Sequence, residues 1–140
     1  MSRVFWDTNL FIYLFEDYGE LSESVARLRA RMLERNDQLL TSTLTLGEIL
    51  VKPAEKKDAA LCAKYEQAIA ASATMIPFDV KAARVYSQLR SNRSLRAPDA
   101  MQLACAGAAG TDLFITNDEH LEGKRAPGIQ FIVSLARAPI

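Results

Sequence analysis

The chain has 140 residues, of which 49% are hydrophobic and 24% are charged, a balance typical of a soluble globular protein with a buried core. Its 17 basic and 17 acidic residues give a formal net charge of zero, which argues against nucleic-acid binding through overall positive charge; RNA binding would need a local basic rim or a bound cation. This length suits one domain, residues 1–140, and leaves little room for a second.

Three features of the sequence bear on cellular location. No apolar run approaches the ~18 residues that a membrane span requires. The N-terminus reaches Asp7 too soon to form a signal peptide. Cys62 and Cys105 lie far apart and outside any C-x-x-C pattern, so we expect both to be reduced core residues. Together these features predict a cytoplasmic protein.

The chain alternates between short apolar runs, which predict strands, and longer segments with helical periodicity. We expect Ser22 to cap the second helix and Pro53 to stop the third. We expect Asp79 to cap the fifth helix and Pro98 to lie in the first turn of the sixth. The expected order is strand 4–6, helix 9–15, helix 22–35, strand 38–41, helix 43–52, helix 59–71, strand 74–77, helix 80–90, helix 98–110, strand 113–116, helical turn 119–122 and strand 130–134, followed by frayed residues. Such alternation predicts an α/β fold with a parallel sheet between helices.

Four acidic residues stand out by their positions, although each has an ordinary explanation. Asp7 follows a strand, where Asp is common in turns, and Glu48 comes three residues after Thr45, as in a capping box. Asp99 lies in the first turn of a helix, where its charge suits the helix dipole. Asp118 could cap the short helical turn that follows it. Taken singly, these explanations are the more common ones.

The combination of these acids favours a shared site. Ligands of parallel α/β sheets bind beyond the carboxyl ends of the strands, and Asp7 and Asp118 each follow a strand. Clustered carboxylates repel one another unless protons or a hard cation neutralise them, and oxygen ligands suit Mg²⁺ or Mn²⁺ rather than Zn²⁺. His120, the only histidine, has no partner at zinc-ligand spacing and is expected at the surface. A bound cation could activate a water and stabilise charge on a phosphodiester.

Short motifs around the same acids resemble those of PIN-domain nucleases. They are Asp7-Thr8-Asn9, Thr45-Leu46-Gly47-Glu48, Pro98-Asp99-Ala100 and Thr116-Asn117-Asp118, and their order and placement match over residues 4–133. The size and layout look most like the VapC toxins of toxin–antitoxin pairs. That resemblance implies a three-layer α/β/α domain with a sheet of about five parallel strands. It also implies a Mg²⁺- or Mn²⁺-dependent endoribonuclease, a homodimer, and inhibition by a small antitoxin.

The resemblance further implies roles for individual residues. Asp7 and Asp99 resemble the principal metal ligands, and Glu48 a further ligand that acts directly or through water. Asp118 resembles the fourth acid, which completes the site or orients the attacking water. Three polar residues resemble those that support the acids, namely Thr8, Asn9 and Thr116. Asn117 stands at a position that varies in the family and receives no role.

Two basic groups could hold RNA phosphates near the metal. Arg90, Arg93 and Arg96 lie in and beside the loop before Asp99, and Lys52, Lys56 and Lys57 follow the helix of Glu48. The alternative for both groups is a solvated loop. The arginines are the better candidates because their loop leads directly into an acid.

The run 10–15 is too apolar to be wholly exposed, and most of it should be core. The remainder could form a groove for an antitoxin helix or a dimer contact, and the sequence does not separate these options. Trp6 lies within a strand and is expected in the core.

Other functions compete with the toxin ribonuclease. One is a PIN-domain ribonuclease that acts in RNA processing without an antitoxin. Another is an α/β binding module that has lost catalysis, against which the intact acids argue. A phosphatase with Asp7 as covalent nucleophile would normally have a second acid two residues later, where this chain has Asn9.

Overall fold

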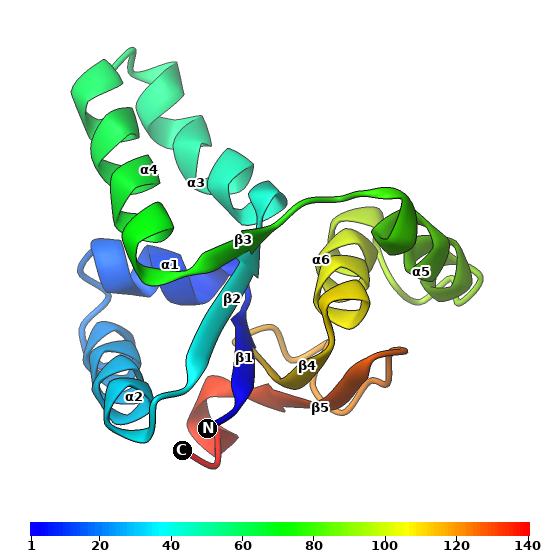
Figure 1. The fold of residues 1–140 in the computed structure, drawn as a ribbon. Helices are drawn as coiled ribbons and strands as arrows, with labels where there is room; N and C mark the ends of the chain where they lie inside the picture. Colours follow the sequence, from blue (N-terminus) through cyan, green and yellow to red (C-terminus); the bar gives the residue numbers. More distant parts are fainter.

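The computed structural model describes residues 1–140 and contains one sheet of five strands (Figure 1). The strands are β1 (Arg3–Trp6), β2 (Gln38–Ser42), β3 (Thr74–Ile76), β4 (Thr111–Thr116) and β5 (Ile129–Ser134). Their order is β3-β2-β1-β4-β5, and every neighbouring pair is parallel. The predicted sheet of about five parallel strands is therefore confirmed.

Helices cover both faces of this sheet, which gives the predicted three-layer α/β/α architecture (Figure 1). The helices are α1 (Thr8–Phe15), α2 (Glu20–Arg35), α3 (Thr43–Glu55), α4 (Ala59–Ser72), α5 (Val80–Arg90) and α6 (Ala97–Ala109). Side chains of β1 point alternately to the two faces, as expected for a strand buried on both sides. Phe5 packs in the core beneath α5 and α6, whereas Val4 and Trp6 pack in the core beneath α1 to α4.

The order of the strands creates a crevice at one edge of the sheet. From β1 the chain builds the sheet in one direction through β2 and β3, and it then returns to the other side of β1 with β4 and β5. Ligands of open α/β sheets bind outside the carboxyl ends of the strands at such a reversal. Here the reversal lies between β1, which ends just before Asp7, and β4, which ends at Thr116.

Two predicted helix boundaries were wrong. Ser22 does not cap α2; the cap is Gly19, whose φ of 63° is a conformation that glycine tolerates. The Ser22 hydroxyl instead accepts the Tyr18 N–H and donates to the Glu16 carbonyl, joining α1 to α2. Pro53 does not stop α3, which continues to Glu55. Because Pro53 lies in the last turn, its missing N–H costs a single hydrogen bond, and its ring is buried.

The predicted helical turn at 119–122 is a series of turns rather than a helix. Leu121 N–H bonds the Asp118 carbonyl and Lys124 N–H bonds the Leu121 carbonyl, but no longer ladder forms. The residues after β5 are not frayed throughout, since Leu135–Arg137 form a short 3-10 helix. The buried Leu121 side chain anchors the turns against the core of α5 and α6.

Several smaller expectations are met. Trp6 is fully buried, His120 is exposed, and Pro98 lies in the first turn of α6. Both cysteines are free thiols, and Cys105 is in the core, where burial raises its pKa to about 11. Cys62 is only partly buried, so its predicted place in the core was wrong. None of the helices combines the length and the apolar character that a membrane span would need.

Candidate active site

Asp7 lies at the point where β1 ends and α1 begins. Its backbone N–H extends the β1–β4 pairing by bonding the Ile115 carbonyl at 3.0 Å. One carboxylate oxygen, Oδ1, accepts the Thr8 N–H at 2.9 Å, so Asp7 is also the N-cap of α1. The other oxygen, Oδ2, accepts the Thr116 hydroxyl at 2.8 Å. Asp7 can therefore both cap α1 and form part of a shared site.

Glu48 projects from α3 and is joined to α1 by one hydrogen bond. The Thr8 hydroxyl donates to Glu48 Oε1 at 2.7 Å. The capping-box explanation for Glu48 is wrong, because Ser42 is the N-cap of α3 and its hydroxyl accepts the Thr45 N–H. Glu48 therefore has no role at the start of its helix and is an exposed carboxylate beside Asp7.

Asp99 and Asp118 are held together by a cation from the protein itself. Arg96 Nε lies 3.1 Å from Asp99 Oδ2, and Arg96 Nη2 lies 3.3 Å from Asp118 Oδ2. Asp99 also lies in the first turn of α6, as its ordinary explanation requires. Asp118 accepts the His120 N–H at 2.9 Å and so fixes the turn after β4. The Arg96 side chain is 71% exposed, so these ion pairs are open to solvent.

Shared neighbours bring the four acids to one edge of the sheet. Thr8 links Asp7 to Glu48, and the Thr116 hydroxyl, which donates to Asp7, accepts the Asp118 N–H at 3.0 Å. Burial raises the pKa of Asp7 above its ordinary value, hydrogen bonds from Thr116 and Thr8 lower it in part, and the charges of Asp99 and Glu48 raise it further. The Asp7 carboxylate therefore interacts electrostatically with both Asp99 and Glu48.

The donor set suits a hard divalent cation, since it offers only carboxylate oxygens. Burial is the main cause of the raised pKa of Asp7, and the nearby charges of Asp99 and Glu48 add to it. Such accumulated negative charge favours the binding of a cation. In this arrangement, however, no three acidic, histidine or cysteine side chains are spaced to surround an ion. Holding a cation would thus require side-chain movement, foremost of Arg96 away from Asp99 and Asp118.

Of the three polar residues that were expected to support the acids, Thr8 and Thr116 contact them and Asn9 does not. Thr8 contacts Asp7 and Glu48, and Thr116 contacts Asp7 and Asp118. Asn9 Oδ1 accepts the Asn117 N–H at 3.3 Å, which ties α1 to the loop after β4. Asn117, to which no role was given, also donates from Nδ2 to the Tyr13 hydroxyl.

Gln102, a polar residue of α6 that is 3% exposed, was not among the residues predicted from the sequence. Its amide nitrogen lies within hydrogen-bond distance of Asp7, Thr8 and Thr45. The available signal was a single amide on an otherwise apolar stretch of helix, three residues after Asp99. A buried polar side chain needs partners, so such a residue points to a polar site beneath the helix.

The predicted arginines differ in position. Arg96 contacts two acids, and Arg93 is exposed in the loop before α6. Arg90 donates to the Leu95 carbonyl at 2.5 Å and so braces this loop. A hollow of about 220 Å³ adjoins the loop and is lined by Ser94, Leu95, Arg96, Asp99, His120 and Leu121. Arg96 is the only one of these arginines that lines this hollow.

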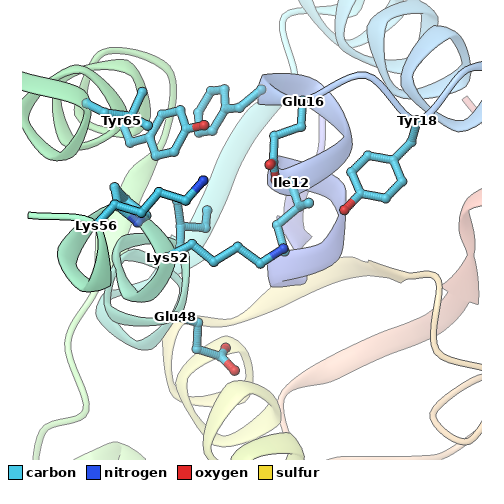
Figure 2. A pocket seen from close by; sticks show the side chains of 11 residues that line it. Ile12, Glu16, Tyr18, Glu48, Lys52, Lys56 and Tyr65 are labelled. Atoms are coloured by element: carbon cyan, nitrogen blue, oxygen red, sulfur yellow. The ribbon is translucent and has the colours of Figure 1, made fainter. Parts of the chain in front are cut away.

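A second hollow, of about 130 Å³, lies between α1 and the α3–α4 hairpin (Figure 2). Lys52 and Lys56 line it, and Lys57 does not. Within the apolar run, Leu10 and Phe11 are buried, whereas Ile12 and Phe15 line this hollow. Tyr65 stands on one side and Glu48 lies at the opposite rim (Figure 2). The ring of Tyr65 stacks on that of Phe15. The expectation that most of the run is core was wrong, since the residues after Phe11 are only partly buried against the core. The expectation that the remainder could line a groove is met by Ile12 and Phe15.

Solved structures with the same fold come from toxin–antitoxin complexes. VapBC2 of Rickettsia felis bound to a promoter DNA fragment has 18% identity and a TM-score of 0.73, with 94% of this chain and 97% of that chain covered. DNA-bound VapBC of Salmonella typhimurium has 20% identity and a TM-score of 0.71, with 96% and 99% covered. VapBC-5 of Mycobacterium tuberculosis has 21% identity and a TM-score of 0.62, with 95% and 99% covered. These likenesses concern the fold.

A search of curated proteins found no significant match. A family model described as the PIN domain matches residues 4–126 and so spans most of the chain, including every acid of the site. The resemblance to PIN domains that the motifs indicated is thereby confirmed, and its extent differs only in ending before β5. This chain belongs to the PIN domain family.

Proposed function

We propose that this protein is a Mg²⁺- or Mn²⁺-dependent endoribonuclease and the toxin of a VapBC-type toxin–antitoxin pair. The single observation that carries this proposal is the meeting of four acids from separate segments at the edge where the strand order reverses. The proposal takes residues 1–140 as one PIN-like domain.

The candidate metal ligands are Asp7, Glu48, Asp99 and Asp118. When bound, the divalent cation lowers the pKa of a coordinated water and stabilises charge that builds on the phosphodiester. Because phosphoryl transfer depends mainly on positioning and charge neutralisation, the protein needs no nucleophile of its own. A phosphatase with a covalent intermediate would need a second acid at position 9. This chain has Asn9 there, and its oxygen accepts the Asn117 N–H, so that alternative is disfavoured.

Side chains of the protein would orient the metal ligands, position the water and bind the RNA. Neutral donors, the Thr8 N–H and the Thr116 hydroxyl, each bind one oxygen of Asp7 and fix the plane of its carboxylate. Asp118 is partly exposed and can accept a proton from water or orient it. Arg96 lies between the acids and the solvent, where it can bind an RNA phosphate once it leaves its carboxylate partners.

The expected partners are an RNA substrate, a small VapB-like antitoxin and a second copy of the chain. Support for the antitoxin comes from the shared fold with chains of VapBC complexes. The hollow between α1 and the α3–α4 hairpin offers an apolar surface next to Glu48, which suits a helix of the antitoxin. An antitoxin seated there would lie against the candidate site.

RNA cleavage by purified protein tests the enzymatic part of this proposal. We expect cleavage in Mg²⁺ or Mn²⁺, and no cleavage in EDTA or in the Asp7→Ala and Asp99→Ala variants. Glu66→Ala, which removes an exposed acid of α4, is the matched control and should retain activity. Full activity in EDTA, or in either Asp variant, would contradict the mechanism.

Growth arrest on induced expression tests the toxin assignment. We expect arrest by the wild type and none by Asp7→Ala, and sequencing of RNA ends after brief induction should report the target. Cleavage without growth arrest would instead indicate a PIN-domain ribonuclease of RNA processing that has no antitoxin. A protein that binds RNA but never cleaves it would indicate a catalytically silent module.

A further inference from the structure

Gln102 lies on α6 one turn after Asp99, in a stretch where its neighbours Leu103 to Gly107 are buried. Its side chain is 3% exposed, so a polar amide is enclosed directly beneath the acids. An amide buried without hydrogen bonds destabilises a protein by about 1–3 kcal/mol on mutational scales. Gln102 must therefore have hydrogen-bond partners if it is not to lower the stability of the fold.

Ser42 fixes the orientation of the Gln102 amide. The Ser42 hydroxyl oxygen accepts the Thr45 N–H at 3.3 Å as the cap of α3, which leaves its own proton free. That proton is directed to Gln102 Oε1, with which Ser42 Oγ is in hydrogen-bond contact. Because an amide oxygen only accepts and the NH₂ group only donates, this contact turns the NH₂ group toward the acids.

The Gln102 NH₂ group then donates to oxygens that belong to the site. Nε2 lies 2.7 Å from Thr45 Oγ1, 3.1 Å from Thr8 Oγ1 and 3.3 Å from Asp7 Oδ1. With two N–H groups for three oxygens, the amide holds Thr45 with one and shares the other between Thr8 and Asp7. Gln102 thus touches α3, α1 and the candidate metal ligand that follows β1.

The amide also sets the direction of the Thr8 hydroxyl. A threonine hydroxyl has one proton, and Thr8 has oxygens of Glu48 at 2.7 Å and of Thr45 at 3.2 Å within reach. Gln102 and Thr41 both donate to the Thr45 hydroxyl oxygen and occupy its two lone pairs. The Glu48 carboxylate only accepts, so the Thr8 proton is directed to Glu48 while Thr8 accepts from Gln102. One buried amide therefore points hydrogen-bond donors at Asp7 directly and at Glu48 through Thr8.

We propose that Gln102 is a positioning residue for the candidate metal ligands Asp7 and Glu48. Its amide holds one oxygen of Asp7 and, through Thr8, one oxygen of Glu48, so that both carboxylates keep a fixed orientation toward a cation. This inference rests on the proposed function of the site. Residues that hold metal ligands in this way typically change metal affinity or activity by about 10- to 100-fold when removed.

The test compares Mn²⁺ binding and RNA cleavage in the wild type and in Gln102→Met, which keeps the length of the side chain and removes its hydrogen bonds. Calorimetry without RNA, well below the unfolding temperature, should give Mn²⁺ affinity about 10- to 100-fold weaker in Gln102→Met. In saturating RNA the kcat should fall, while the KM for RNA stays within about twofold because Gln102 is buried and cannot contact the substrate.

The matched control is Thr111→Val. Thr111 is 2% exposed and its hydroxyl bonds the Ala106 carbonyl at 2.7 Å, so this variant removes a buried hydrogen bond of α6 far from the acids. It should lower the unfolding temperature and leave Mn²⁺ affinity unchanged. A purely structural Gln102 would behave like this control.

Two outcomes separate the hypotheses, and a second variant is available if the first does not fold. If the wild type binds Mn²⁺ and cleaves RNA, and Gln102→Met binds Mn²⁺ equally well, the inference about Gln102 is overturned and the proposed function stands. If the wild type itself neither binds Mn²⁺ nor cleaves RNA, the proposed function fails. Should Gln102→Met not fold, Ser42→Ala replaces it, since it keeps the amide and removes the group that orients it; unchanged Mn²⁺ affinity there would overturn the inference.

Discussion

The two halves of the acidic edge are held in different ways. Asp7 and Glu48 contact neutral donors, the hydroxyls of Thr8 and Thr116 and the amide of Gln102. Asp99 and Asp118 contact a charged one, the 71% exposed guanidinium of Arg96. The donors of the first half are buried side chains on three segments, whereas the second half depends on a side chain that lies in solvent.

The two halves differ in whether the contacts orient the carboxylates or neutralise their charge. Neutral donors orient a carboxylate without cancelling its charge, so Asp7 keeps a raised pKa from burial and from its acidic neighbours. Arg96 cancels charge, but an exposed ion pair contributes only about 0–1 kcal/mol and is easily exchanged. We infer that the first half is organised before a cation binds and that the second is organised when Arg96 is displaced.

The largest effect should come from comparing Asp7→Asn with Asp118→Asn in RNA cleavage. Because Asp7 is the more rigidly held acid, its loss should reduce kcat by about 100- to 1,000-fold, in the range found when one pre-organised stabilising group is removed. The loss of Asp118 should cost about tenfold, as for groups that act by orienting others. Single-turnover cleavage at saturating Mg²⁺ measures both. Equal losses would break the proposed distinction between the halves.

A smaller effect of opposite sign is expected on stability without metal. The pKa of Asp7 is raised in the folded protein, so its ionised form destabilises the fold at pH values above that pKa. Asp7→Asn should therefore unfold at a higher temperature than the wild type at neutral pH in EDTA. The difference should shrink as the pH falls through the folded pKa of Asp7, where the wild-type carboxyl takes up its proton.

Calorimetric scans between neutral and acidic pH check this expectation, and saturating Mg²⁺ should reverse it, since only the wild type gains from binding the cation. Asp112→Asn, at the opposite end of β4, is the control. A wild type that is more stable than Asp7→Asn at neutral pH in EDTA would contradict the electrostatic interpretation.

The smallest effect is expected for Arg96→Gln, which tests whether this side chain exchanges its acids for RNA. Stability should change by no more than about 1 kcal/mol, since both ion pairs are exposed. If Arg96 binds a phosphate, the slope of log affinity against log salt should decrease by about 1. Arg93→Gln, in the same loop but away from the acids, provides the comparison. Identical salt dependence in Arg96→Gln and the wild type would remove Arg96 from the RNA-binding surface.

Much of the site could be read from local sequence because acids at strand ends have a fixed relation to a parallel sheet. Asp7 and Asp118 follow β1 and β4, which pair directly, so their positions followed once the strands were recognised. Glu48 required knowing where α3 begins. The predicted start at residue 43 was correct, and the capping-box explanation with Thr45 as the cap was wrong because Ser42 is the cap.

The sequence by itself determined the α/β class, the parallel sheet and the acids at its carboxyl edge, because hydrophobic periodicity and strand-end chemistry are local properties. Only the tertiary structure decided which groups hold those acids. Gln102 is separated by 57 to 95 residues from Thr45, Thr8 and Asp7, and Arg96 by 22 residues from Asp118. Hydrogen bonds and ion pairs are short-range contacts, so the pairing of such distant residues depends on how the helices pack and not on any pattern along the chain.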